Sequence, residues 1–257
     1  MLRVETPFAL TAPAAAVRAR PILPLEARGL VLETAGRRLV DGLDLELQPG
    51  ALTVILGPNG AGKSLALRLL HGLLRPTAGA ITWAGRAADA DVRRRQAMVF
   101  QKPVLLRRST AANLDYVLKR QSLSRSRRRA RLQELLTLGN LLHLARVPAR
   151  LLSGGEQQRL AVVRALACEP EVLFLDEPTA SLDPAATLAI EALIERAHGA
   201  GTAILLVTHD LGQARRLARE VVFLHQGRAV EKAEAAAFFA GPRSAIARAY
   251  LAGDLAL

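Results

Sequence analysis

The sequence has few of the features that mark secreted, membrane-spanning or disulfide-stabilised proteins. Cys168 is the only cysteine among 257 residues, which excludes an internal disulfide and fits a reducing cytoplasm. No apolar run approaches the roughly 20 residues that span a bilayer, so we expect a soluble or peripheral protein. The N-terminal stretch lacks the core of a signal peptide, because Glu5, Pro7 and Arg18 interrupt it, as do Pro13 and Arg20.

Aromatic residues are also scarce, at 4% of the chain, whereas basic residues give a net charge of +12. Such a charge can indicate a nucleic acid or an anionic membrane as partner. The densest basic cluster opens an expected helix and consists of Arg125, Arg127, Arg128, Arg129 and Arg131. No aromatic residues interleave with it, as a platform for single-stranded nucleic acid would require. We therefore interpret the cluster as a solvated helix face and expect no nucleic-acid partner.

A glycine-rich loop is the first motif that carries chemistry. A strand-like run, Leu52–Leu56, precedes it and an amphipathic helix, Leu65–Leu73, follows it, which is the context that a phosphate-binding P-loop requires. Glycines let backbone N–H groups turn toward the phosphates, and the helix N-terminus adds partial positive charge. Lys63 offers a charge to the β- and γ-phosphates and Ser64 a hydroxyl ligand to magnesium. The expected nucleotide-binding residues are Gly57, Pro58, Asn59, Gly60, Ala61, Gly62, Lys63 and Ser64.

Two adjacent carboxylates end a second apolar run, Val172–Leu175. This pattern predicts a buried strand that brings charge to its carboxyl end, where α/β sheets bind ligands. Neighbouring side chains on a strand point in opposite directions, so the two acids suit different roles. Asp176 is expected to bind magnesium, through water, and Glu177 to act as general base toward an attacking water. A surface acid after a strand is the alternative for Glu177.

With both sites in view, the chain resembles the nucleotide-binding subunit of ATP-binding cassette (ABC) transporters over residues 28 to about 232. In the family's order, the matching segments are the P-loop, Gln101 (Q-loop), Leu152-Ser153-Gly154-Gly155-Glu156 (signature), Val172–Glu177 (Walker B), Ser181-Leu182-Asp183 (D-loop) and His209 (switch histidine). The resemblance implies an α/β fold with a RecA-like P-loop NTPase core, an antiparallel β subdomain and an α-helical subdomain. It also implies ATP and Mg²⁺ as cofactors.

The resemblance further implies a head-to-tail dimer in which each signature closes on the ATP of the other copy. Ser153, Gly154 and Gly155 precede an expected helix, Glu156–Ala167, and offer a hydroxyl and free amides suited to phosphate. A simple N-cap is the alternative interpretation. Asp183 would run along the dimer seam, beside the bound nucleotide.

Two further residues acquire catalytic roles from the resemblance. Gln101 would reach magnesium or the attacking water through its amide oxygen. His209 would contact the γ-phosphate and hold Glu177 and the water in place. The segment Thr34-Ala35-Gly36 lacks the aromatic side chain that usually stacks on adenine in the family, so no strong preference for ATP over GTP is expected from stacking.

The expected organisation is a flexible extension, residues 1–26, followed by one nucleotide-binding domain, residues 27–252. Within that domain, residues 27–101 and 170–232 would form the catalytic core, 102–169 the helical subdomain and 233–252 terminal helices. In importers of this family, the segment matching Pro103–Tyr116 receives a coupling helix of the permease. We expect no regulatory β-domain of the kind that some sugar and molybdate importers append.

The wording of Phe100–Ser109 and of Gly62-Lys63-Ser64-Leu65 resembles the tungstate-type oxyanion importers. The resemblance therefore implies a cytoplasmic ATPase subunit, peripheral on the inner face of the membrane, that powers import of tungstate or a related oxyanion such as molybdate or phosphate. Its partners would be a second copy, a membrane permease and, indirectly, a periplasmic or extracellular anion-binding protein.

An exporter ATPase is the first alternative. DNA-repair and chromosome ATPases insert coiled coils or zinc modules between the P-loop and the signature, and residues 65–151 contain neither heptads nor cysteines. Ribosome-associated cassette proteins usually carry two sets of these motifs, whereas this chain carries one.

Overall fold

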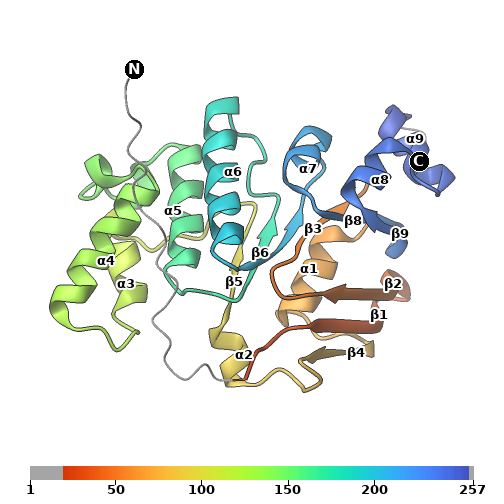
Figure 1. Cartoon of the computed structure of the whole chain (residues 1–257), viewed down its shortest axis with the longest axis horizontal. Coiled ribbons are helices and arrows are strands. Elements are labelled where there is room, and N and C mark those ends of the chain that lie inside the picture. Colours follow the sequence, from red (N-terminus) through yellow and green to blue (C-terminus); the bar gives the residue numbers. More distant parts are fainter. Residues whose placement is uncertain (1–19, 255–257) are drawn as a thin grey trace.

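Two β-sheets organise the computed structural model, which describes residues 20–254 (Figure 1). The smaller sheet is antiparallel, in the order β2-β1-β4, and the larger has the order β5-β6-β7-β3-β8-β9. The small sheet contains β1 (Leu25–Thr34), β2 (Arg37–Leu47) and β4 (Ala78–Trp83). The large sheet contains β3 (Leu52–Leu56), β5 (Gln96–Val99), β6 (Val172–Asp176), β7 (Ala203–Val207), β8 (Glu220–His225) and β9 (Arg228–Glu234). All pairs in the large sheet are parallel except β8 with β9.

Helices cover both faces of the large sheet. They are α1 (Lys63–His71), α2 (Ala90–Arg94), α3 (Thr110–Leu118), α4 (Arg125–Leu138), α5 (Gly154–Leu166), α6 (Pro184–Gly199), α7 (Leu211–Leu217), α8 (Ala235–Ala240) and α9 (Ala245–Ala252). In Figure 1, α5, α6 and α7 lie on one side of the sheet, whereas α1 and the small sheet lie on the other. Helices α3 and α4 form the end farthest from the small sheet. This arrangement confirms the expected fold class.

The central strands are buried along their whole length because both faces are covered. Alternate side chains of β6 enter two separate cores: Leu173 and Leu175 pack with residues of α5 and α6, and Val172 and Phe174 pack with residues of α1 and the small sheet. This alternation follows from the two-residue period of a strand. It explains why β3, β6 and β7 appear in the sequence as continuous apolar runs.

The structure shortens the expected N-terminal extension, residues 1–26, at its last seven residues. Ile22 and Leu23 are buried and β1 already begins at Leu25, so residues 20–26 belong to the folded body. These apolar side chains pack in the core beneath the small sheet, where burial favours order. The rest of the expected extension, residues 1–19, lies outside the described residues.

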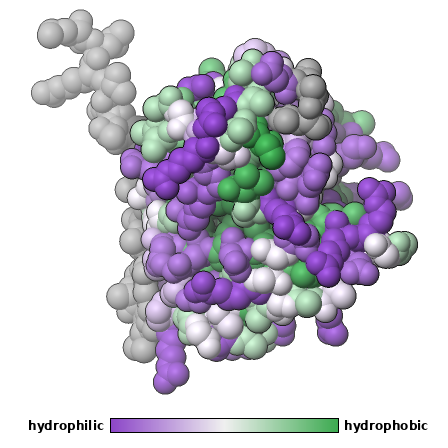
Figure 2. All heavy atoms as spheres, turned by 90° about the vertical axis from the view of Figure 1, so that its right-hand side faces the viewer, coloured by the Kyte–Doolittle hydropathy of each residue, from purple (hydrophilic) through white to green (hydrophobic). Residues whose placement is uncertain are grey.

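Helix starts and short helices also differ from expectation. Helix α1 begins at Lys63 rather than Leu65, and α5 begins at Gly154 rather than Glu156. Helices α2 and α7 were not predicted, because five and seven residues are too few to show a helical period. Among residues 20–254, no helix is both long enough and apolar enough to cross a membrane. Figure 2 shows mainly hydrophilic residues, with apolar ones between them, on the face around the right-hand end of Figure 1.

Candidate functional site

The loop between β3 and α1 is enclosed by backbone from two other strands. A Cβ atom added to Gly57 would lie 2.1 Å from the carbonyl oxygen of Leu224 on β8. At Gly62, where φ is +92°, it would lie 2.7 Å from the carbonyl oxygen of Leu39 on β2. Only glycine fits such approaches. The backbones of β8 and β2 therefore leave room only for glycine at these two positions of the expected P-loop.

Lys63 occupies the first position of α1, directly after the loop. Its buried ammonium donates hydrogen bonds to the carbonyl oxygens of Gly57, at 2.8 Å, and Pro58, at 2.9 Å. Burial lowers the pKa of Lys63, against the opposing effect of the negative charges on Glu177 and Asp176. An ammonium has three N–H donors, so its third can reach a phosphate oxygen.

Ser64 and Asp176 bring two oxygen donors together from distant parts of the chain. The Ser64 hydroxyl donates to Asp176 Oδ1 at 2.6 Å, and Arg68 Nη2 lies 3.6 Å from Asp176 Oδ2. Hydroxyl and carboxylate oxygens are the ligands that Mg²⁺ prefers, and this ion is usually completed by phosphates and water. No group of three or more His, Cys, Asp or Glu side chains suited to a metal occurs within residues 20–254. The hydroxyl of Ser64 and the carboxylate of Asp176 fit a magnesium ion whose other ligands are phosphate and water.

The structure brings together the three side chains expected to be catalytic. Glu177 Oε2 lies 3.2 Å from the amide nitrogen of Gln101 and 3.1 Å from Nδ1 of His209. The Glu177 backbone has a φ of +45°, and its N–H donates to the carbonyl oxygen of Val207 at 2.9 Å. A positive φ at a non-glycine residue is costly and persists where surrounding contacts impose it. The Glu177 carboxylate thus faces Gln101, which follows β5, and His209, which follows β7.

The signature residues have a structural role of their own. Ser153 caps α5: its hydroxyl accepts from the N–H of Glu156, and the Glu156 carboxylate accepts from the N–H of Ser153. This backbone hydrogen bond lowers the pKa of Glu156. A Cβ atom at Gly155 would lie 2.8 Å from that of Ala186 on α6. The N-cap interpretation is therefore correct as geometry, although the Ser153 O–H remains able to donate to a phosphate.

Asp183 likewise caps a helix, since its Oδ1 accepts from the N–H of Ala186 at 2.8 Å. Gly154 and Gly155 approach the side chains of Leu182 and Ala186. The signature and the D-loop segment thus lie beside each other.

The sequence interpretation missed Arg68, which contacts Asp176 from α1. Its position four residues after Ser64 puts both on one face of the helix, and this spacing could have pointed to it. Arg68 Nε is buried without a hydrogen-bond partner in the described structure.

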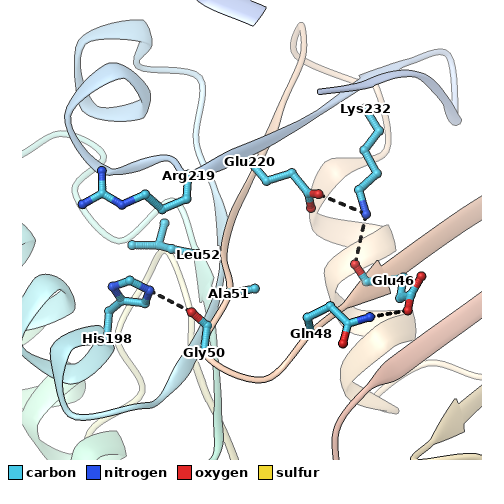
Figure 3. Close-up of a pocket in the computed structure, with 9 residues that line it drawn as sticks. All are labelled: Glu46, Gln48, Gly50, Ala51, Leu52, His198, Arg219, Glu220 and Lys232. Atoms are coloured by element: carbon cyan, nitrogen blue, oxygen red, sulfur yellow. Dashed lines mark hydrogen bonds and ion pairs between the residues drawn. The ribbon is translucent and has the colours of Figure 1, made fainter. Parts of the chain in front are cut away.

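A separate pocket lies where β3 and β8 begin, at the end of these strands that is farther from the P-loop (Figure 3). It is lined by Glu46, Gln48, Gly50, Ala51, Leu52, His198, Arg219, Glu220 and Lys232. Leu52 and Glu220 are the first residues of β3 and β8, whereas the P-loop follows the last residue of β3. Lys232 pairs with Glu220 at 3.2 Å, and His198 bonds the carbonyl oxygen of Gly50 at 2.9 Å. The pocket therefore shares no residue with the candidate site.

A P-loop after a buried parallel strand, with two acids at the end of another strand, defines a P-loop nucleoside triphosphatase. A family model described as ABC transporter matches residues 40–180. The chain belongs to this family, as an ABC ATPase cassette.

Three curated relatives are ATP-binding proteins of import systems. The methionine import protein MetN of Nocardia farcinica is 40% identical over 218 residues, which are 81% of this chain and 65% of that protein. The tungstate uptake protein TupC of Peptoclostridium acidaminophilum is 39% identical over 197 residues, 76% of this chain and 92% of that protein. The phosphate import protein PstB 2 of Natronomonas pharaonis is 36% identical over 236 residues, 86% of this chain and 83% of that protein. The chain thus spans just under two thirds of the first of these relatives.

Solved structures of cassettes share the fold. The cassette cbiO1 of Clostridium perfringens, part of the ABC transporter complex cbiONQ, has a TM-score of 0.76 at 29% identity over 84% of this chain and 90% of that one. The cassette MJ0796, as a dimer in a post-hydrolysis state with ADP and Pi, has a TM-score of 0.74 at 27% identity over 82% of this chain and 98% of that one.

Proposed function

We propose that this chain binds and hydrolyses ATP to power import through a separate membrane permease. The observation that carries the proposal is the meeting of Gln101 and His209 on one oxygen of the Glu177 carboxylate, at 3.2 and 3.1 Å. Three strand ends converge there, next to a P-loop. Such an arrangement suits orientation of a water molecule toward a γ-phosphate.

The P-loop residues, 57–64, bind the triphosphate in this mechanism. Backbone N–H groups and the start of α1 face the phosphates, and Lys63 offsets their charge. Magnesium supplies further neutralisation of the β- and γ-phosphates when bound with ATP. Ser64 would hold the ion directly, and Asp176 through water, with the amide oxygen of Gln101 as a further ligand.

Glu177 acts as the general base. Its carboxylate takes a proton from the attacking water as the water oxygen bonds to the γ-phosphorus and the bond to ADP breaks. Gln101 and His209 hold the carboxylate in place, and His209 also contacts the γ-phosphate. Most of the rate then comes from positioning and charge neutralisation rather than from covalent chemistry.

The active unit is a head-to-tail dimer of two copies. Ser153, Gly154 and Gly155 of a second copy complete the phosphate site from the start of α5, and Asp183 lies along the seam. One observation supports this arrangement: the similar cassette MJ0796 has been solved as a dimer with ADP and Pi.

The remaining assignments concern the assembly. With the bounds adjusted to the observed elements, residues 20–101 and 170–234 serve as the catalytic core, 102–169 as the helical subdomain and 235–252 as the terminal helices. The segment Pro103–Tyr116 receives the permease, so the subunit is peripheral on the inner face of the membrane. Val104 supports docking of the permease on this segment, because its apolar side chain is 67% exposed and free to contact a partner.

Tungstate or a related oxyanion is the first candidate for the imported solute, with phosphate and methionine as the others that the relatives suggest. The tungstate protein TupC aligns over 92% of its own length. The solute need not touch this chain, because an importer chooses it through the binding protein and the permease.

The test of the hydrolytic mechanism is Glu177→Gln. The variant should bind ATP as the wild type does and lose at least about a hundredfold in kcat, because it lacks the general base. Glu195→Gln, on the exposed side of α6, is the matched control and should retain normal turnover. Normal hydrolysis by Glu177→Gln would remove Glu177 from the role of base.

A further inference from the structure

The C-terminal helix α9 places a tyrosine beside the candidate catalytic residues, outside every motif described above. The Tyr250 hydroxyl lies 3.5 Å from the backbone carbonyl oxygen of His209. Its ring packs on that of Phe223, with centroids 5.2 Å apart. Phe223 in turn pairs with Leu56, the residue before the P-loop. Tyr250 therefore touches the segment after β7 and the strand that supports the P-loop.

The surroundings of Tyr250 keep its hydroxyl protonated. Burial raises the pKa of Tyr250 above its ordinary value of 10, and the negative charge of Glu177 raises it further. The backbone N–H of Gly57 has the opposite effect. A protonated phenol can donate one hydrogen bond, and the carbonyl oxygen of His209 is the acceptor described for it.

Helix α9 is anchored independently of this hydroxyl. The Glu231 carboxylate on β9 accepts from the N–H groups of Arg243 and Ser244, each at 2.9 Å. Ser244 caps the helix by accepting from the N–H of Ala247, and Ala247 is fully buried. The tyrosine ring therefore has a fixed platform, and removal of its oxygen should leave the helix in place.

We propose that Tyr250 is a positioning residue for ATP hydrolysis, whose hydroxyl holds the His209 backbone so that the imidazole meets the Glu177 carboxylate. This inference rests on the proposed function, because it uses the roles given there to His209 and Glu177. The His209 side chain is 52% exposed and follows β7 in a segment outside any helix or strand. Packing alone therefore does little to direct the imidazole, and a backbone contact can decide where Nδ1 lies.

The test is Tyr250→Phe in the full chain, which keeps the ring on Phe223 and removes only the hydroxyl. We expect kcat for ATP hydrolysis to fall by about threefold to tenfold, as for the loss of one hydrogen bond that orients a catalytic group. KM for ATP should stay within about twofold and Tm within about 2 °C. The control, Ser244→Ala, removes the cap of α9 without touching the site. It should lower Tm and leave kcat unchanged.

Three results would overturn the proposal: a fall in kcat of less than threefold in Tyr250→Phe, a rise in KM at unchanged kcat, or an equal loss of kcat in Ser244→Ala. The last two would show a role in nucleotide binding or in helix structure instead. Glu177→Gln separates this test from the proposed function. If that variant is inactive while Tyr250→Phe is normal, only the inference about Tyr250 fails; if it is fully active, the assignment of the base fails.

Discussion

Several side chains of the site serve both the fold and the chemistry. Ser153 caps α5 and is proposed to meet the γ-phosphate of a second copy. Asp183 caps α6 and is proposed to lie on the same seam. A substitution to alanine would change stability and activity together, because loss of an N-cap by itself lowers the free energy of unfolding by about 1 kcal/mol. A substitution that keeps the cap can separate them.

Ser153→Asp is such a change. Aspartate caps a helix as well as serine does, so the free energy of unfolding in urea should change by less than about 0.5 kcal/mol. Its negative charge would oppose the incoming γ-phosphate, and we expect ATP hydrolysis to fall by at least about tenfold.

The matched control is Ser124→Asp, since Ser124 caps α4 in the same way and is outside the proposed site. It should hydrolyse ATP normally. Equal turnover in the two variants would leave Ser153 with its capping role alone.

At the scale of the elements, α1 links the phosphate site to the core below it. Its first residue, Lys63, faces the loop, and its last, His71, packs edge-on against Phe174 of β6, with ring centroids 5.3 Å apart. Burial lowers the pKa of His71 to about 4, and His71 Nδ1 is buried without a partner in the described structure. The His71 imidazole is therefore neutral in the folded protein at neutral pH.

The stability of the chain should therefore fall on acidification. Between the ordinary histidine pKa of 6.5 and the folded value of about 4, the unfolded state binds a proton that the folded state does not. Stability then rises with pH through this window. His71→Phe keeps a ring at this position and cannot titrate, so the decrease in Tm from pH 7.5 to pH 5 should be about 2–5 °C smaller than in the wild type.

Other groups titrate in the same window, so the comparison needs a second histidine variant. His143 is exposed, and His143→Phe should retain the wild-type decrease in Tm. If His71→Phe shows that same decrease, His71 does not control the pH dependence.

At the scale of the whole molecule, the proposed import function leaves the choice of solute to a permease and a binding protein. The decisive measurement is ATP hydrolysis in liposomes that contain the subunit, a candidate permease and the binding protein of that permease. Tungstate, molybdate, phosphate, sulfate and methionine would each be titrated. We expect tungstate to stimulate hydrolysis at a far lower concentration than the others. The binding protein must saturate before the permease signals to the cassette, and its own solute saturates it at the lowest concentration.

Stimulation by methionine or phosphate at the lowest concentration would keep the import function and replace the solute. If no solute stimulated hydrolysis while Glu177→Gln still abolished basal turnover, the ATPase would stand and import would not. An assembly with Glu177→Gln in the subunit is the control for contaminating ATPases.

Local patterns in the sequence were sufficient for the parts of the site that are continuous in the chain. The bounds of β3 were predicted correctly, since a short apolar run between polar residues leaves little choice of where the strand begins and ends. The P-loop needed no tertiary information, because the strand, the glycines, Lys63 and Ser64 follow one another directly. The acids at 176 and 177 were likewise visible as the end of an apolar run.

Contacts between distant segments were decided only by the tertiary structure. Gln101 and His209 lie 76 and 32 positions from Glu177, and parallel pairing of β5, β6 and β7 is what brings the three together. The same holds for Tyr250. It lies on α9, and only the tertiary structure shows that Phe223 of β8 packs against its ring. A sequence specifies which side chains end each strand; the order of strands in the sheet, set by packing of both faces, determines which of those ends meet.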